Sequence, residues 1–170
     1  MPANVEIKAR VHDPGTLRTR ITQAAGGTAR VLRQTDVFFH APRGRLKLRL
    51  CEGAPAELIY YDRETARGPK LSRYHVARTD AGEALRALLA AALGERGTVR
   101  KQRELWIVER TRIHLDQVEG LGAFLELEVV LQPGEPAARG QRIAREWMER
   151  LGVEGVDLVE AAYIDLLEGD

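Results

Sequence analysis

Strict alternation of apolar and charged residues along several short segments is the feature that most constrains this chain. In residues 45–51, leucines alternate with Arg45, Lys47 and Arg49. Residues 4–11 and 123–131 alternate in the same way. Because successive side chains of a strand point to opposite faces of a sheet, a period of two predicts strands with one apolar and one charged face.

The same pattern extends over most of the chain and predicts about eight strands. Glycine and proline residues separate the segments, and the short connections indicate antiparallel pairing. The predicted strands span residues 4–11, 29–40, 45–51, 57–63, 71–78, 98–109, 111–118 and 123–131. Helices are predicted outside the sheet, over residues 16–25, 80–93, 137–151 and 156–168, with Asp80 as the N-cap of the second. The predicted fold class is α+β, with one domain over residues 1–170.

Charge is distributed unevenly along the chain. Residues 1–112 carry 22 Lys and Arg against 12 Asp and Glu, and residues 113–170 carry 4 against 13, so the formal net charge is only +1. One charged strand face is normally solvated, but several strands with rows of like charge would repel one another on an open surface. Such rows are instead suited to the lining of a closed barrel that holds a polyanion.

Acidic strand faces accompany the basic ones. Glu126 and Glu128 lie two residues apart, as do Glu6 and Lys8. Each pair alone is typical of an exposed face, but carboxylates converging on one cavity bind hard divalent cations such as Mg²⁺ or Mn²⁺. A cation that bridges carboxylates to phosphates accounts for both signs of charge in one lumen.

Several classes of protein are excluded or disfavoured. No apolar run approaches the roughly 20 residues that span a bilayer, and the first residues do not resemble a signal peptide. The single cysteine, Cys51, excludes an internal disulfide and a cysteine-rich zinc site. A cytoplasmic location is therefore expected. The balanced charge and the inward basic rows argue against nucleic acid as a partner.

Segments spread along nearly the whole chain resemble the CYTH superfamily, which groups class IV adenylyl cyclases, thiamine triphosphatases and inorganic triphosphatases. The class IV cyclase-like branch is the most similar. The matching segments are residues 4–10, 44–49, 58–63, 72–74, 100–103, 111–122, 124–128 and 162–167. The resemblance implies a closed or nearly closed antiparallel eight-stranded β-barrel, the triphosphate tunnel, with helices packed outside.

The resemblance also implies roles for particular residues. It implies that a triphosphate contacts Lys8, Lys47, Arg49, Arg63, Arg73, Lys101 and Arg103. It implies that Mg²⁺ or Mn²⁺ is held or oriented by Glu6, Asp116, Glu126 and Glu128. The candidate catalytic residues are Glu6, Lys8 and Asp116. Lys8 is interpreted either as a phosphate clamp, which we favour, or as a group that assists proton transfer. Asn4 departs from the family pattern, which has glutamate at this position, and it brings no charge to a metal.

Three functions follow as alternatives. The first is a metal-dependent triphosphatase acting on tripolyphosphate, ATP or thiamine triphosphate, with water as the nucleophile. The second is a class IV adenylyl cyclase, in which the substrate's 3′-hydroxyl attacks and for which Tyr60, Tyr61 and Tyr74 are candidate stacking residues. The third is a polyphosphate- or nucleotide-binding module without turnover. We expect a monomer or a homodimer, with Trp147 and Tyr163 packed in the core.

Overall fold

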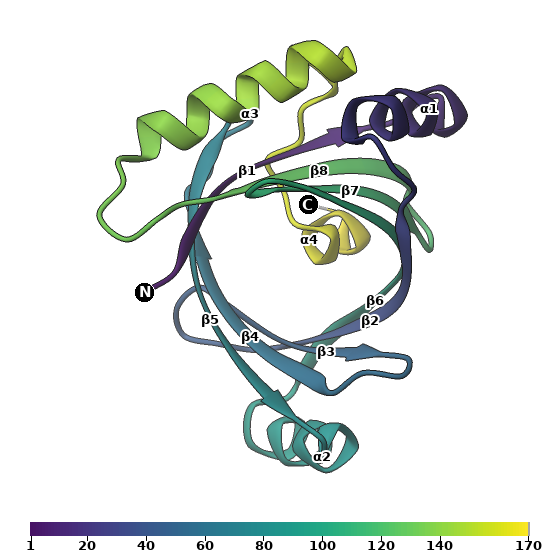
Figure 1. Ribbon diagram of the computed structural model, residues 1–170. Helices are drawn as coiled ribbons and strands as arrows, with labels where there is room; N and C mark the ends of the chain where they lie inside the picture. The colour runs from purple at the N-terminus through teal and green to yellow at the C-terminus, as the bar shows by residue number, and fades with distance from the viewer. Residues whose placement is uncertain (170) are drawn as a thin grey trace.

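Eight strands pair edge to edge until the first meets the last, which closes the sheet into a barrel (Figure 1). The computed structural model describes residues 1–169. The strands follow the order β1–β5–β4–β3–β2–β6–β7–β8 around the barrel, and every neighbouring pair is antiparallel. They are β1 (Ala3–Arg10), β2 (Arg30–Phe39), β3 (Arg45–Cys51), β4 (Ala56–Arg63), β5 (Lys70–Thr79), β6 (Glu95–Val108), β7 (Thr111–Val118) and β8 (Gly122–Val130). The predicted eight-stranded antiparallel barrel is confirmed.

Three helices cover the outer surface of this barrel (Figure 1). Helix α1 (Pro14–Ala25) and helix α3 (Ala137–Leu151) lie over β1, β6, β7 and β8, and helix α2 (Gly82–Leu93) lies over β2 and β3. Beneath α1 and α3, Ile7, Trp106 and Leu115 pack against Trp147 and Leu151. The apolar strand faces therefore point outward under the helices, and the charged faces point into the lumen.

The register between neighbouring strands places particular charged residues side by side. Across β7 and β8, His114 lies opposite Glu126, and across β1 and β8, Glu6 lies opposite Glu128. Directly opposed residues in an antiparallel pair point to the same face of the sheet. The alternation predicted from the sequence thus becomes one continuous charged lining inside the barrel.

The C-terminal region differs from the single helix predicted over residues 156–168. It contains a short 3₁₀ turn (Gly155–Asp157), an extended stretch and then helix α4 (Tyr163–Glu168). The extended stretch pairs with β1 through a bridge between Ala9 and Leu158. The extended stretch then crosses one end of the barrel. There its carbonyl groups accept hydrogen bonds from cations of the lumen.

Helix α4 occupies that end of the barrel instead of packing on its outside, which corrects the prediction for this helix (Figure 1). Ile164 packs with Phe38, Val99 and Phe124, whose strands form the barrel wall. A Cβ atom on Gly97 would lie only 2.8 Å from the Ile164 side chain, so glycine at this position permits the close approach of α4 to β6. The barrel is therefore closed at this end.

The predicted N-cap of α2 is wrong. The cap residue is Ala81, whose backbone N–H donates to the Thr79 hydroxyl, and no side chain caps the helix. Among the described residues, no helix combines the length and the apolar character needed to cross a membrane.

Candidate functional site

The barrel encloses a cavity of about 150 Å³ that is lined mainly by charged and aromatic side chains. Its cationic lining residues are Lys8, Lys47, Arg49, Arg63, Lys101, Arg103 and Arg112. Its carboxylates are Asp36, Glu6, Glu126 and Glu128. Of the seven residues expected to contact a triphosphate, six line this cavity, and they come from four strands.

Arg73 is the exception among the expected triphosphate contacts. Its side chain is exposed on the outer face of β5, in a surface groove near Met1 and Glu135, while Ser72 and Tyr74 face the lumen. Side chains alternate between the two faces of a strand, so Arg73 must point outward when Ser72 and Tyr74 point inward. The placement of Arg73 in the site is therefore corrected.

Asp36 binds three of the cations, and the sequence analysis did not identify it. Its carboxylate accepts hydrogen bonds from Lys47 at 2.8 Å, from Arg49 at 2.8 Å on each oxygen, and from Lys101 at 3.0 Å. Burial raises the pKa of Asp36, but Arg49, Lys101 and Lys47 outweigh it and hold the pKa well below its ordinary value. Asp36 thus acts as an internal anion where a phosphate is expected to bind. The only signal in the sequence was that Asp36 is the single acidic residue of its strand.

The lysines of this cluster are perturbed by their surroundings. Burial lowers the pKa of Lys101 to about 7, although attraction to Asp36 opposes the shift. Burial also lowers the pKa of Lys47, again opposed by Asp36. Such a lumen holds its cationic charge at a cost in desolvation, which an incoming polyanion would offset.

Asp116 lies at the closed end of the barrel and is fully buried. Both of its oxygens accept from Arg103, at 2.7 and 2.6 Å, and one also accepts from the Tyr163 hydroxyl at 2.8 Å. Arg103 donates in addition to Glu126 at 2.6 Å. Asp116 is therefore committed to Arg103 and Tyr163, and the structure does not bring it into the group of carboxylates that could share a metal ion with Glu126.

Glu126 and Glu128 do converge, and His114 joins them. The three residues each offer a ligand atom, and these atoms lie within 4.8 Å of one another, which makes the group able to hold a metal ion. Burial raises the pKa of Glu126, but Lys8, His114 and Arg103 outweigh it, so the pKa is held well below its ordinary value. Glu126 is therefore ionised and available to a cation near neutral pH.

Glu6 lies near this group but is engaged elsewhere. Arg63 donates to its Oε1 atom at 2.9 Å, and burial raises the pKa of Glu6 despite the attraction of Arg63. Asn4 also faces the lumen and is 5% exposed, and its Oδ1 atom has no hydrogen-bond partner among the described residues. A buried amide oxygen without a partner is a suitable ligand for a hard cation or its water. The residues present therefore fit a divalent cation at the β1 and β8 side of the lumen.

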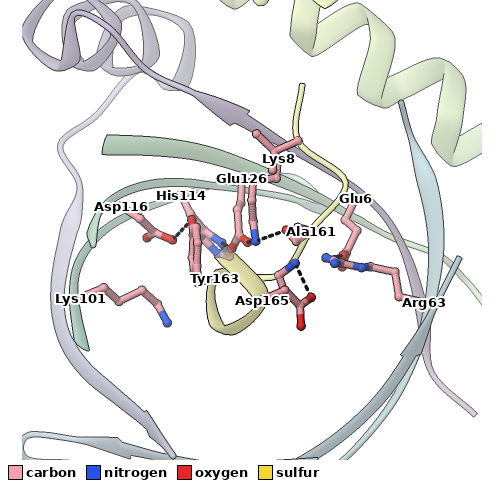
Figure 2. Close-up of polar contacts among 12 residues, drawn as sticks. Glu6, Lys8, Arg63, Lys101, His114, Asp116, Glu126, Ala161, Tyr163 and Asp165 are labelled. Carbon is pink, nitrogen blue, oxygen red and sulfur yellow. Dashed lines mark hydrogen bonds and ion pairs between the residues drawn. The ribbon is translucent and has the colours of Figure 1, made fainter. Parts of the chain in front are cut away.

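The extended stretch before α4 presents three successive backbone carbonyls to cations of the lumen. Lys70 donates to the carbonyl of Val159 at 3.3 Å, Arg63 to that of Glu160 at 3.0 Å, and Lys8 to that of Ala161 at 3.2 Å. Figure 2 shows the contact of Lys8 with Ala161 and the neighbouring pair of Glu6 and Arg63. Lys8 and Arg63 are thus held in place before any ligand is bound.

Tyr163 and Lys70 are further residues that the sequence analysis did not assign to the site. Tyr163 packs in a buried apolar cluster as expected, and its ring also lies 3.7 Å from the Lys8 Nζ atom inside the barrel (Figure 2). Lys70 is fully buried, and burial lowers its pKa to about 8. Trp147 likewise lies in the core as expected. Of the candidate stacking residues, Tyr61 and Tyr74 line the cavity, whereas Tyr60 has the opposite parity.

Comparison with known proteins gives both a family and a set of similar folds. The family model described as the CYTH domain matches residues 2–163. A comparison with curated proteins gave no significant match. Among solved structures, the PH1012 protein of Pyrococcus horikoshii has a TM-score of 0.85 at 22% identity, covering 96% of this chain and 98% of that one.

Two further similar structures have descriptions that name an activity. A candidate adenylate cyclase from Vibrio parahaemolyticus has a TM-score of 0.80 at 17% identity, covering 97% of each chain. A candidate adenylyl cyclase from Hippeastrum, HpAC1, is described as having a dominant triphosphatase activity. Its TM-score is 0.70 at 15% identity, covering 99% of this chain and 96% of that one. At these identities the likeness concerns the fold.

Proposed function

Because this chain belongs to the CYTH domain family, we propose that it is a divalent-metal-dependent triphosphatase that acts on a triphosphate bound in the barrel lumen. The observation that carries this proposal is the convergence of six expected cationic side chains on one cavity beside Glu126 and Glu128. Transfer of a phosphoryl group requires charge neutralisation and positioning more than covalent chemistry. The lumen is suited to both.

The lysines and arginines are proposed to bind the phosphate chain. Arg49 and Arg103 present planar guanidinium groups that match pairs of phosphate oxygens, and Lys47 and Lys101 add point charges on the same side. Asp36 and Asp116 hold these cations in position before the substrate arrives. Since α4 closes one end, the substrate enters from the opposite end.

A divalent cation would be held by Glu126 and Glu128, and it would supply charge neutralisation at the transferred phosphoryl group. Mg²⁺ and Mn²⁺ are the candidates. Glu126 stays ionised because Lys8, His114 and Arg103 surround it. Glu6, Lys8 and Asp116 are proposed to take part in catalysis, Asp116 by orienting Arg103. Lys8 is best suited to clamp a phosphate, because its ammonium group is fixed by Ala161 and Tyr163.

Hydrolysis of a triphosphate is the reaction that we favour. The similar Hippeastrum protein is described as having a dominant triphosphatase activity. The alternative is a class IV adenylyl cyclase. It is supported by the cyclase descriptions of similar structures and by Tyr61 and Tyr74 in the cavity lining.

The same proposal covers partners and location. The partner is a small-molecule triphosphate and not nucleic acid, because the cations that would grip phosphates point inward. The lumen residues all come from one chain, so the proposal is compatible with a monomer or a homodimer. A cytoplasmic location, where nucleotides and polyphosphates are available, is part of the proposal.

The test is a product assay with Mg²⁺ or Mn²⁺ and tripolyphosphate, ATP or thiamine triphosphate as the substrate. Orthophosphate from tripolyphosphate supports the triphosphatase, and cyclic AMP with pyrophosphate from ATP supports the cyclase. Binding of all three without any product leaves a binding module. The double variant Glu126→Gln/Glu128→Gln should lose turnover, whereas Glu104→Gln, which removes a carboxylate paired with Arg18 outside the barrel, should retain it.

A further inference from the structure

His114 is a buried side chain that the proposed chemistry has not yet used. It lies on β7 directly opposite Glu126 of β8, and it is 4% exposed. Its Nδ1 atom is buried and has no hydrogen-bond partner among residues 1–169. Leaving a buried polar atom unpaired is energetically unfavourable, so such an atom in a charged cavity indicates a missing partner.

The unpaired nitrogen is directed toward two carboxylates. It lies 3.7 Å from Oε2 of Glu126 and 4.0 Å from Oε1 of Glu128. From these contacts we propose that Nδ1 of His114 is the third protein ligand of a divalent cation held by Glu126 and Glu128. The site then contains one nitrogen and at least two oxygens, which favours a first-row transition cation such as Mn²⁺ over Mg²⁺.

The geometry requires only a modest contraction. Neighbouring ligand atoms of an octahedral cation at about 2.1 Å lie about 3 Å apart. The two glutamate side chains are 19% and 20% exposed, so they have room to turn toward a common centre. His114 comes from the neighbouring strand and fixes the third corner of the site.

Basic residues currently share these carboxylates. Arg103 donates to Oε2 of Glu126 at 2.6 Å, Lys8 lies 3.4 Å from its Oε1, and Arg112 lies 3.4 Å from Oε2 of Glu128. Oε1 of Glu128 accepts no hydrogen bond from these three basic residues, and it is the oxygen of that carboxylate nearest to Nδ1 of His114, at 4.0 Å. A cation therefore has one unshared carboxylate oxygen and one unshared nitrogen available at the start. Cation binding is then expected to displace Arg103 from Glu126 toward the lumen.

The chemistry of the ligands decides the metal preference. Mg²⁺ binds oxygen ligands and retains several waters, whereas imidazole nitrogen is a good ligand for divalent transition cations. An imidazole in the set therefore adds affinity for Mn²⁺ that it does not add for Mg²⁺. The inference deepens the proposed function, because it rests on the metal site proposed there, but it concerns binding and not turnover.

The experiment measures Mn²⁺ binding by the full-length chain without substrate. Free Mn²⁺ is followed by electron paramagnetic resonance during a titration, and the bound ion is examined by electron spin echo envelope modulation. We expect ¹⁴N modulation from a directly bound imidazole. In His114→Gln the modulation should vanish, and the Kd for Mn²⁺ should rise about tenfold or more. The Kd for Mg²⁺, measured by competition, should change less than about threefold.

The control variant is His75→Gln, which changes an exposed histidine of β5. It should keep both the modulation and the affinity. Circular dichroism checks the fold of each variant, and the wild-type spectrum alone remains decisive if His114→Gln does not fold. Bound Mn²⁺ without ¹⁴N modulation in the wild type, or no Mn²⁺ binding, would overturn the inference. Triphosphate turnover together with oxygen-only Mn²⁺ coordination would leave the proposed function intact, whereas nitrogen-bound Mn²⁺ without turnover would remove only the proposed function.

Discussion

Arg103 donates to both carboxylate oxygens of Asp116, at 2.7 and 2.6 Å, in the interior of the closed barrel end. Both side chains are almost fully buried. Burial raises the pKa of Asp116, but Arg103 outweighs it and lowers the pKa below its ordinary value. The pair therefore fixes the orientation of one guanidinium group that faces the proposed phosphate site.

Removal of Asp116 should destabilise the fold strongly. Breaking a buried ion pair by deleting one partner typically costs about 3–5 kcal/mol, because the other charge remains buried. We expect Asp116→Ala to lower the free energy of unfolding by that amount in urea denaturation. The control Glu104→Ala breaks a more exposed pair with Arg18 and should cost about 0–1 kcal/mol. Equal losses of unfolding free energy in the two variants would contradict the stabilising role of the buried Asp116–Arg103 pair.

Asp36 competes with a bound polyanion for the same three cations. Asp36→Asn should lower the Tm without ligand, because Lys47, Arg49 and Lys101 lose their shared counter-charge. The same variant should show a larger rise of Tm with tripolyphosphate than the wild type, because the anion restores that charge. Differential scanning fluorimetry measures both quantities. A smaller ligand-induced shift in the variant would show that Asp36 supports the anion instead of replacing it.

The buried ammonium group of Lys101 makes stability depend on pH. Its pKa is about 7 in the folded chain, with burial as the main cause, and about 10.4 when unfolded. Between these values the unfolded chain binds more protons, so the contribution of Lys101 to stability rises with pH, by at most about 1.4 kcal/mol per unit. Urea denaturation at pH 6.5, 7.5 and 8.5 should show this rise in the wild type relative to Lys101→Met. If the unfolding free energies of the two proteins differ by the same amount at all three pH values, the prediction is refuted.

Triphosphate binding should respond to the same titration in the opposite direction. As pH rises above about 7, Lys101 loses the charge that attracts the anion. The Kd of the wild type for tripolyphosphate should therefore rise relative to that of Lys101→Arg, which stays charged, by at most about tenfold per unit. Isothermal titration calorimetry at several pH values tests this. Comparing the two proteins cancels the titration of tripolyphosphate itself.

Tyr163 stabilises the closed end through both its hydroxyl and its ring. Tyr163→Phe removes the hydrogen bond to Asp116 and should cost about 1–3 kcal/mol of unfolding free energy. Tyr163→Ala also removes the ring from Lys8 and from Phe124, which lies at a centroid distance of 5.1 Å, and should cost about 3–5 kcal/mol. The control Tyr60→Phe, on the outer parity of β4, should stay within about 0.5 kcal/mol of the wild type. Indistinguishable Phe and Ala variants at position 163 would exclude a role for the ring.

Much of the barrel was predictable because alternation is a local property. Residues 45–51 of β3 show both faces of their strand in the sequence itself, and the boundaries of β3 and β7 agree with the prediction. The charged faces of β1, β3, β6 and β8 predict a polyanion site from the sequence alone. Where alternation weakens, as in β5, the sequence did not distinguish the parity of Arg73 from that of Ser72 and Tyr74.

The sequence by itself determined which residues share a strand face, and hence that cationic and acidic rows exist in one chain. Only the tertiary structure decided which face is inside, because the helices must cover the apolar face and closure of the sheet turns the other face inward. Contacts inside the lumen were likewise decided by strand register and by the path of the C-terminal segment. These bring Asp36 of β2 to Lys101 of β6, His114 of β7 to Glu126 of β8, and Tyr163 to Lys8, and no local period in the sequence encodes such pairings.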